Sequence, residues 1–153
     1  MVKRLYIFIF IVSFILSAPV HLNTADKVSY NIYKHFNLDK KIPYNVKDVE
    51  IISDTDFDLI YIYHLNPSGF ILISADDRYE PYIGYSFDSN FKSDNIPLNF
   101  EYFFNSIKGK IKSNITSNSL RSNEAKYLWD IYTDDNYRNS NVRNVSPLIV
   151  AEF

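Results

Sequence analysis

Few side chains in this sequence have types and spacings suited to chemistry. The 153 residues include no cysteine, which removes any thiol nucleophile, disulfide or zinc–thiolate site. Asp54, Asp56 and Asp58 stand at alternate positions, as the ligands of a calcium loop do. However, no glycine occupies the sharp-turn position and no downstream glutamate completes the ligand set. We therefore expect a solvated turn between two strands rather than a metal site.

Two further candidates, an aspartate pair and a histidine, are also weak. Neighbours on a strand point to opposite faces, so Asp76 and Asp77 are poorly placed to share a substrate. His64 has no second ligand nearby and is expected to pack at a strand end. The sequence has three glycines and contains neither a Gly-rich phosphate loop nor a nucleophile elbow. We expect no catalytic activity, no metal and no cofactor.

The elements that must position these side chains follow from hydrophobic periodicity. Helical spacing predicts two amphipathic helices over residues 25–36 and 98–111, and a short third helix follows residue 123. Thr24 and Asn123 are the expected N-caps of the first and third helices. Strands are predicted over residues 49–52, 59–65, 70–75 and 82–87. This order predicts an α+β fold: an antiparallel sheet of about four strands with helices packed on one face.

Residues 1–18 have the pattern of a secretory signal peptide. Lys3 and Arg4 precede an apolar run that ends at the small residues Ser17 and Ala18. The run is shorter than the ~20 residues that a transmembrane helix needs, so an uncleaved anchor is the weaker alternative. Cleavage after Ala18 would leave Pro19 next to the cut, which is unfavourable, so the site itself stays open. We expect a secreted or periplasmic protein, free of the membrane after cleavage.

The remaining chain is predicted to form one domain over residues 19–135. Residues 136–153 read as a polar linker that ends in an apolar extended stretch. The formal net charge is −2, which gives no indication of a nucleic-acid partner.

A family resemblance rests on two strands and the loop that follows them. The sequence reads GFILISADDR over residues 69–78 and PYIGYS over residues 81–86, and then has Phe91 and Asn95-Ile96-Pro97. This combination resembles the propeptides of bacterial streptopain-type cysteine proteases and the stand-alone Spi-type inhibitors similar to them. The resemblance covers most of the exported chain.

The resemblance implies a domain that binds a papain-like protease and holds it inactive. It implies a protease-binding loop that includes Phe91, Asp94, Asn95 and Ile96. Asn95 corresponds to an asparagine that reaches the protease active site in the family; it could also cap the helix that follows Pro97, and both roles can hold together. The family motif residues with an expected structural role are Gly69, Phe70, Ser74, Asp76, Arg78, Gly84, Tyr85 and Ser86.

The sequence departs from a full protease precursor at its end. Within residues 136–153, the stretch Val145-Ser146-Pro147-Leu148 resembles the junction that leads into the mature protease, so this end reads as a truncated junction to an absent protease domain. Ala151, Glu152 and Phe153 stand where the mature enzyme would start, and no catalytic cysteine is present. The expected function is therefore a secreted, non-catalytic inhibitor or propeptide domain that blocks a streptopain-like cysteine protease, in trans or originally in cis. The alternatives are a truncated precursor fragment and a secreted α+β module that binds some other protein.

Overall fold

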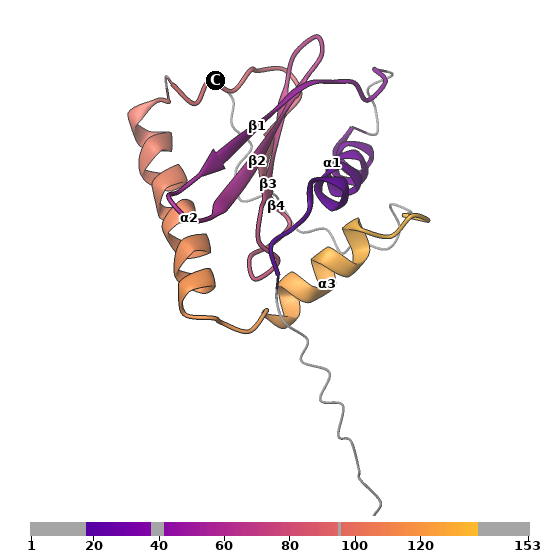
Figure 1. Ribbon diagram of the computed structural model, residues 1–153. Coiled ribbons are helices and arrows are strands. Elements are labelled where there is room, and N and C mark those ends of the chain that lie inside the picture. Colours follow the sequence, from indigo (N-terminus) through magenta and orange to yellow (C-terminus); the bar gives the residue numbers. More distant parts are fainter. Residues whose placement is uncertain (1–17, 38–41, 95, 138–153) are drawn as a thin grey trace, which may run out of the picture.

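The computed structural model describes residues 18–37, 42–94 and 96–137 (Figure 1). The elements, in order, are α1 (Leu22–Phe36), β1 (Val46–Ser53), β2 (Asp58–Leu65), β3 (Phe70–Ser74), β4 (Tyr82–Ser86), α2 (Leu98–Thr116) and α3 (Asn123–Tyr132). The predicted signal peptide up to residue 17, Asn95 and the end of the chain from residue 138 lie outside the described residues. Within the described ranges, no helix is both long and apolar enough to cross a membrane.

The four strands form one antiparallel meander in the order β1-β2-β3-β4. The central strands β2 and β3 bury almost every side chain, whereas the edge strand β1 is only partly buried. Continuous burial along a strand is typical of a sheet that is covered on both faces. The α+β fold class and the antiparallel sheet of four strands are confirmed.

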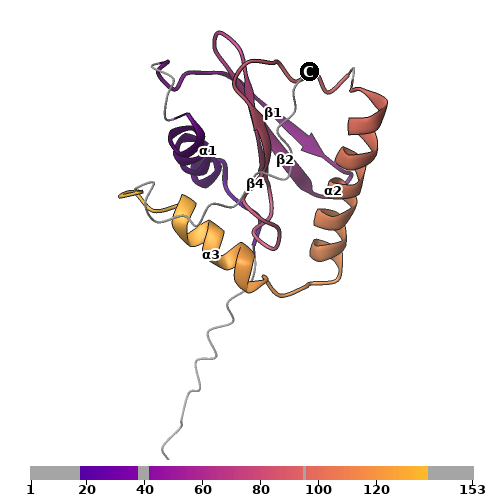
Figure 2. The same ribbon diagram turned by 180° about the vertical axis from the view of Figure 1, so that it is seen from behind.

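The helices lie on both faces of the sheet, not on one as predicted (Figures 1 and 2). One face carries Tyr61, Tyr63 and Ile71, which form a core with α1 and α3. The other face carries Ile60 and Leu72, which form a second core with α2. The prediction of one covered face was wrong because two apolar faces of a central strand each need a cover.

The caps and ends of the helices differ from the predicted positions. The Ser122 hydroxyl accepts a hydrogen bond of 3.0 Å from the Ala125 N–H, so Ser122 and not Asn123 caps α3. Thr24 lies inside α1, whose N-cap residue His21 makes no side-chain capping bond. Helix α2 continues to Thr116, and Ile115 in this extra turn packs against the core under α2. That contact favours helix beyond residue 111, where the periodicity predicted its end.

Candidate functional site

The loop between β4 and α2 crosses one end of the sheet, next to the turn between β2 and β3 (Figure 1). The turn and the loop are tied together by two hydrogen bonds. The Ser68 hydroxyl donates to the Phe87 carbonyl oxygen at 3.4 Å, and the Gly69 N–H donates to the Asn90 side-chain oxygen at 3.2 Å. Because the turn belongs to the central hairpin of the sheet, these bonds hold the start of the loop against the rigid part of the fold.

Gly69 allows this close approach. Its φ of +112° lies in a region that side-chain-bearing residues rarely adopt, and a Cβ atom there would stand 2.7 Å from the Ser86 carbonyl oxygen. The motif glycine at this position therefore has a steric role at the base of the loop.

The first residues of the loop form a turn around the Ser86 hydroxyl. This oxygen accepts hydrogen bonds from the N–H groups of Asp88 at 3.4 Å and Ser89 at 3.1 Å. The Phe87 ring packs against Tyr33 of α1 and Tyr85 of β4, with centroid separations of 5.2 Å and 4.9 Å. The path of the loop out of β4 is thus fixed by backbone and aromatic contacts together.

Phe91 anchors the middle of the loop in the core under α2. Its side chain is 7% exposed, and its ring centroid lies 5.2 Å from that of Phe70 and 5.5 Å from that of Phe104. Ile96, which is half-buried, packs against the same core. Phe91, which the sequence grouped with the protease-binding residues, therefore supports the loop from inside the fold.

Between these two residues the sequence is polar, over residues 92–95. The side chains of Lys92 and Asp94 are exposed, and that of Ser93 is half-buried. Asn95 lies outside the described residues, and the N-cap residue of α2 is Pro97. A polar segment between one buried and one half-buried apolar side chain is suited to entering a partner's cleft with little loss of conformational freedom.

An open hollow of about 320 Å³ lies beside this segment. It lies between the loop, α2 and the end of β1, and Asp94, Glu101 and Lys108 give it charges of both signs. The other residues that line it are Ile52, Ser93, Ile96, Phe104 and Asn105. Mixed charge around an open depression fits contact with a polar protein surface.

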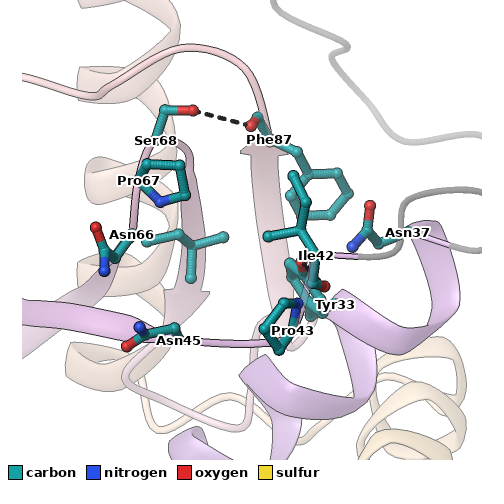
Figure 3. Close-up of a pocket in the computed structure, with 10 residues that line it drawn as sticks. Tyr33, Asn37, Ile42, Pro43, Asn45, Asn66, Pro67, Ser68 and Phe87 are labelled. Carbon is teal, nitrogen blue, oxygen red and sulfur yellow. Dashed lines mark hydrogen bonds between the residues drawn. The ribbon is translucent and has the colours of Figure 1, made fainter.

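A second depression lies at the start of the loop, where Phe87 and Ser68 meet the segment before β1 and the end of α1 (Figure 3). Its free volume of about 20 Å³ is close to that of a single water molecule. This crevice therefore marks the junction of these segments and offers no room for a small-molecule ligand.

The motif residues between β3 and β4 form an internal ion pair. The Arg78 guanidinium donates to Asp76 Oδ2 at 2.7 Å, and its backbone N–H donates to Asp76 Oδ1 at 3.0 Å. The Ser74 hydroxyl donates to the Asp76 carbonyl oxygen at 2.8 Å. Burial raises the pKa of the Asp76 carboxyl, while its bonds to Arg78 act in the opposite direction. Asp76 is 1% exposed and thus acts within the fold.

This β3–β4 connection also holds the connection between α2 and α3. Arg78 donates to the Asn118 side-chain oxygen at 3.3 Å, and Arg121 pairs with the Asp77 carboxylate. Asp76 and Asp77 therefore have different partners. They do not form a shared acid–base site, in agreement with the expectation that adjacent residues point in opposite directions.

The model of the Spi protease inhibitor family matches residues 17–111, which is more than half of the chain. The chain belongs to the Spi protease inhibitor family. No curated protein and no solved structure matches it. The family match includes the motif strands, the anchored loop and most of α2, and the resemblance to Spi-type inhibitors is confirmed.

Two of the remaining motif residues of this Spi-family chain, Tyr85 and Phe70, pack inside the fold. Tyr85 stacks on Phe36 of α1 with centroids 4.5 Å apart, and Phe70 is 1% exposed beneath Phe91. Gly84 carries no steric demand, since a Cβ atom there would meet only Leu72 Cδ1 at 4.0 Å.

The other candidates from the sequence have ordinary partners. His64 Nε2 lies 3.1 Å from Glu50 Oε2 on the neighbouring strand. Asp54 pairs with Lys112 of α2, whose hydrogen bond is the main cause that lowers the Asp54 pKa to about 2. The Ser53 hydroxyl donates to Asp58 at 2.6 Å. Among the described residues, no group of three or more acidic or histidine side chains could hold a metal ion.

Sequence patterns missed the residues that tie the loop to the sheet. Ser68 and Asn90 have ordinary turn composition, and only the folded chain brings them to Phe87 and Gly69. The motif glycine was the one local signal, because a conformation that requires glycine often marks a close backbone approach.

Proposed function

We propose that this Spi-family protein is a secreted, non-catalytic inhibitor of a streptopain-like cysteine protease. Family membership supports a protease as its partner. The observation that carries the proposal is the polar stretch of residues 92–95, in which the Lys92 and Asp94 side chains are exposed, between the buried Phe91 and the half-buried Ile96. The chain itself lacks the cysteine that a protease of this kind would need as its nucleophile.

Inhibition would come from filling the active-site cleft with this segment. An asparagine side chain both donates and accepts hydrogen bonds, so Asn95 could engage the catalytic histidine or the groups around it. Asp94 and Lys92 would meet the polar rim of the cleft.

The scaffold contributes by fixing the loop before binding. The bonds at Ser86 and Asn90 and the Phe91 anchor restrict the loop in the free inhibitor. A loop that is already ordered loses less conformational entropy on binding, which increases affinity. Such a loop can also block the cleft without being positioned for cleavage.

The test is titration of the exported chain against an active streptopain-type protease, with residual cleavage of a peptide substrate as the readout. Stoichiometric inhibition is expected. Asn95→Ala and Asp94→Ala should each weaken inhibition by about tenfold or more, as truncation of a central interface residue does. Asp48→Ala, an exposed position on β1, is the matched control and should leave inhibition unchanged.

A folded chain that leaves the protease fully active would overturn the proposal and favour a module that binds another protein. Inhibition that is insensitive to both loop variants would retain the inhibitor function but exclude the loop as its cause. The protease should come from the same organism, because an inhibitor can be specific for its own target.

A further inference from the structure

The described fold begins with a short segment that pairs with the β3–β4 connection. The Val20 N–H donates to the Ala75 carbonyl oxygen at 2.9 Å, and the Asp77 N–H donates to the Ala18 carbonyl oxygen at 3.4 Å. The Val20 side chain is 6% exposed, and its carbonyl oxygen accepts a bond of 2.8 Å from the Tyr61 hydroxyl. The backbone is therefore held in place from Ala18 onward.

The nitrogen of Ala18 points to a carboxylate. Its N–H donates to Asp77 Oδ1 at 3.0 Å, while Asp77 Oδ2 takes the Arg121 guanidinium. The Asp77 side chain is only 14% exposed, so this carboxylate is shielded from water on most sides. His21 and Asp130 line the same groove. A positive charge on the Ala18 nitrogen would thus contact the Asp77 carboxylate, which also binds the Arg121 guanidinium.

We propose that the export signal is removed between Ser17 and Ala18, and that the new α-ammonium group of Ala18 forms an ion pair with Asp77. The cut is a hydrolysis by a signal peptidase. Water supplies the hydroxyl that completes the Ser17 carboxyl and the hydrogen that completes the Ala18 amine, and the amine then takes a proton from solvent. Ser17 provides the small residue that such a cut requires on its amino-terminal side.

The neighbouring bond is a poorer site for the cut, and a chain cut there would lack two contacts of the folded protein. Cleavage after Ala18 would place Pro19 directly after the cut. It would also remove Ala18, whose N–H and carbonyl oxygen both bond to Asp77. Cleavage one residue earlier preserves both bonds and replaces the amide donor to the Asp77 carboxylate with a charged ammonium donor, so that the hydrogen bond becomes an ion pair.

The ion pair gives stability a defined pH dependence. An α-amino group ordinarily titrates at about 7.7–8.0, and a carboxylate 3.0 Å away raises its pKa in the folded state. Because the folded pKa is then the higher one, the stabilisation is complete below about pH 7 and is lost as the pH rises through the folded value. The other titratable residues that line the groove around Ala18 are Arg121, His21 and Asp130. They are unchanged in both of the chains that the stability test below compares.

The cut is tested by exporting the full chain, with its own first residues, from a secreting bacterium and determining the N-terminus of the product by mass spectrometry. The expected product begins at Ala18. A product that begins at Pro19 or later, or that retains residues before Ala18, would overturn the assignment.

The ion pair is tested by comparing a chain that begins at Ala18 with one that carries Gly-Ser before it. The extension preserves the Ala18 N–H as an amide donor but moves the charge away. At pH 7 the unfolding equilibrium constant of the chain that begins at Ala18 should be about fivefold lower, and the two should converge by about pH 10.5. Equal constants at pH 7 would overturn the ion pair.

Asp77→Asn in both chains should abolish the difference, whereas Asp48→Asn on the exposed face of β1 should preserve it. If Asp77→Asn prevents folding, the α-amino pKa of the unmutated chain, measured by NMR, decides the matter: a value within the ordinary range overturns the proposal. None of these measurements involves a protease, so their outcome is independent of the proposed inhibition.

Discussion

Gly69 meets two backbone requirements at once: a positive φ and a close contact with the base of the loop. Replacing it with alanine would bring a Cβ atom to 2.7 Å from the Ser86 carbonyl oxygen and 3.0 Å from the Phe87 Cα atom. Since these are backbone atoms, relief requires the hairpin and the loop to separate. We expect Gly69→Ala to lower the free energy of unfolding by about 2–4 kcal/mol in urea denaturation.

Two other glycines serve as matched controls for this substitution. A Cβ atom at Gly109 on α2 would meet nothing within 4 Å, and Gly109→Ala should stabilise the helix by about 0.5–1 kcal/mol. Gly84→Ala should change stability little, since only a leucine methyl lies at contact distance. Equal losses at Gly69 and Gly84 would contradict the steric role assigned to Gly69.

The buried pair of Asp76 and Arg78 provides a pH-dependent prediction. In Arg78→Met, the bonds that oppose the effect of burial on the Asp76 pKa are absent, so this pKa should rise further. A carboxyl whose pKa is higher in the folded state costs stability as the pH rises through that pKa. The loss relative to the parent chain should be about 3–5 kcal/mol at pH 8 and smaller at pH 5.

Chemical denaturation at the two pH values measures this loss. Lys112→Met removes an exposed pair with Asp54 and should change stability little at both pH values. If the loss of unfolding free energy in Arg78→Met were the same at pH 8 and pH 5, the guanidinium would have no effect on the Asp76 pKa.

At the scale of elements, the anchored loop links packing to the proposed inhibition. Phe91→Ala should cost about 3–4 kcal/mol of stability and, by freeing the loop, weaken inhibition by roughly tenfold. Ile111→Ala removes a fully buried side chain from the same core, further along α2. It should cost similar stability and leave inhibition unchanged when both variants are measured under conditions where they are folded.

This comparison separates support of the loop from general stability. If both variants inhibit equally, the anchor at Phe91 contributes nothing beyond packing. If both lose inhibition in proportion to their stability, the scaffold as a whole is the determinant.

The elements themselves were predictable where their periodicity was local. The spacing of Phe100, Phe104, Ile107 and Ile111 marked the buried face of α2, and the apolar run of β3 marked a central strand. Neither pattern could show on which face of the sheet a helix would pack. That choice depends on contacts between distant residues, such as Ile62 with the core under α2. The polar contacts of Ser68, Asn90 and Arg121 escaped prediction for the same reason.

The stability of the whole molecule depends on helices that cover each face of the sheet. Helix α3 contributes Ala125, Leu128, Trp129 and Tyr132 to the core that it shares with α1. Polar contacts add to this: the Trp129 indole donates to the Tyr79 carbonyl oxygen at 2.7 Å, and Asn31 of α1 donates to the Tyr132 carbonyl oxygen at 2.9 Å. The family match ends at Ile111, before α3 begins, so sequence similarity covers less than the structural unit does.

A chain that ends after Ser117 tests this difference between the matched region and the structural unit. It contains every residue of the family match but leaves Tyr82, Ile73 and Val28 without the cover that α3 provides. We expect it to lose cooperative thermal unfolding and to bind a hydrophobic dye, because the part of the core that α3 covers becomes exposed. A chain that ends after Tyr137 contains both cores and should unfold cooperatively. If the shorter chain folded and unfolded as cooperatively as the longer one, the core under α2 together with the packing of α1 would specify the fold, and α3 would be an addition to it.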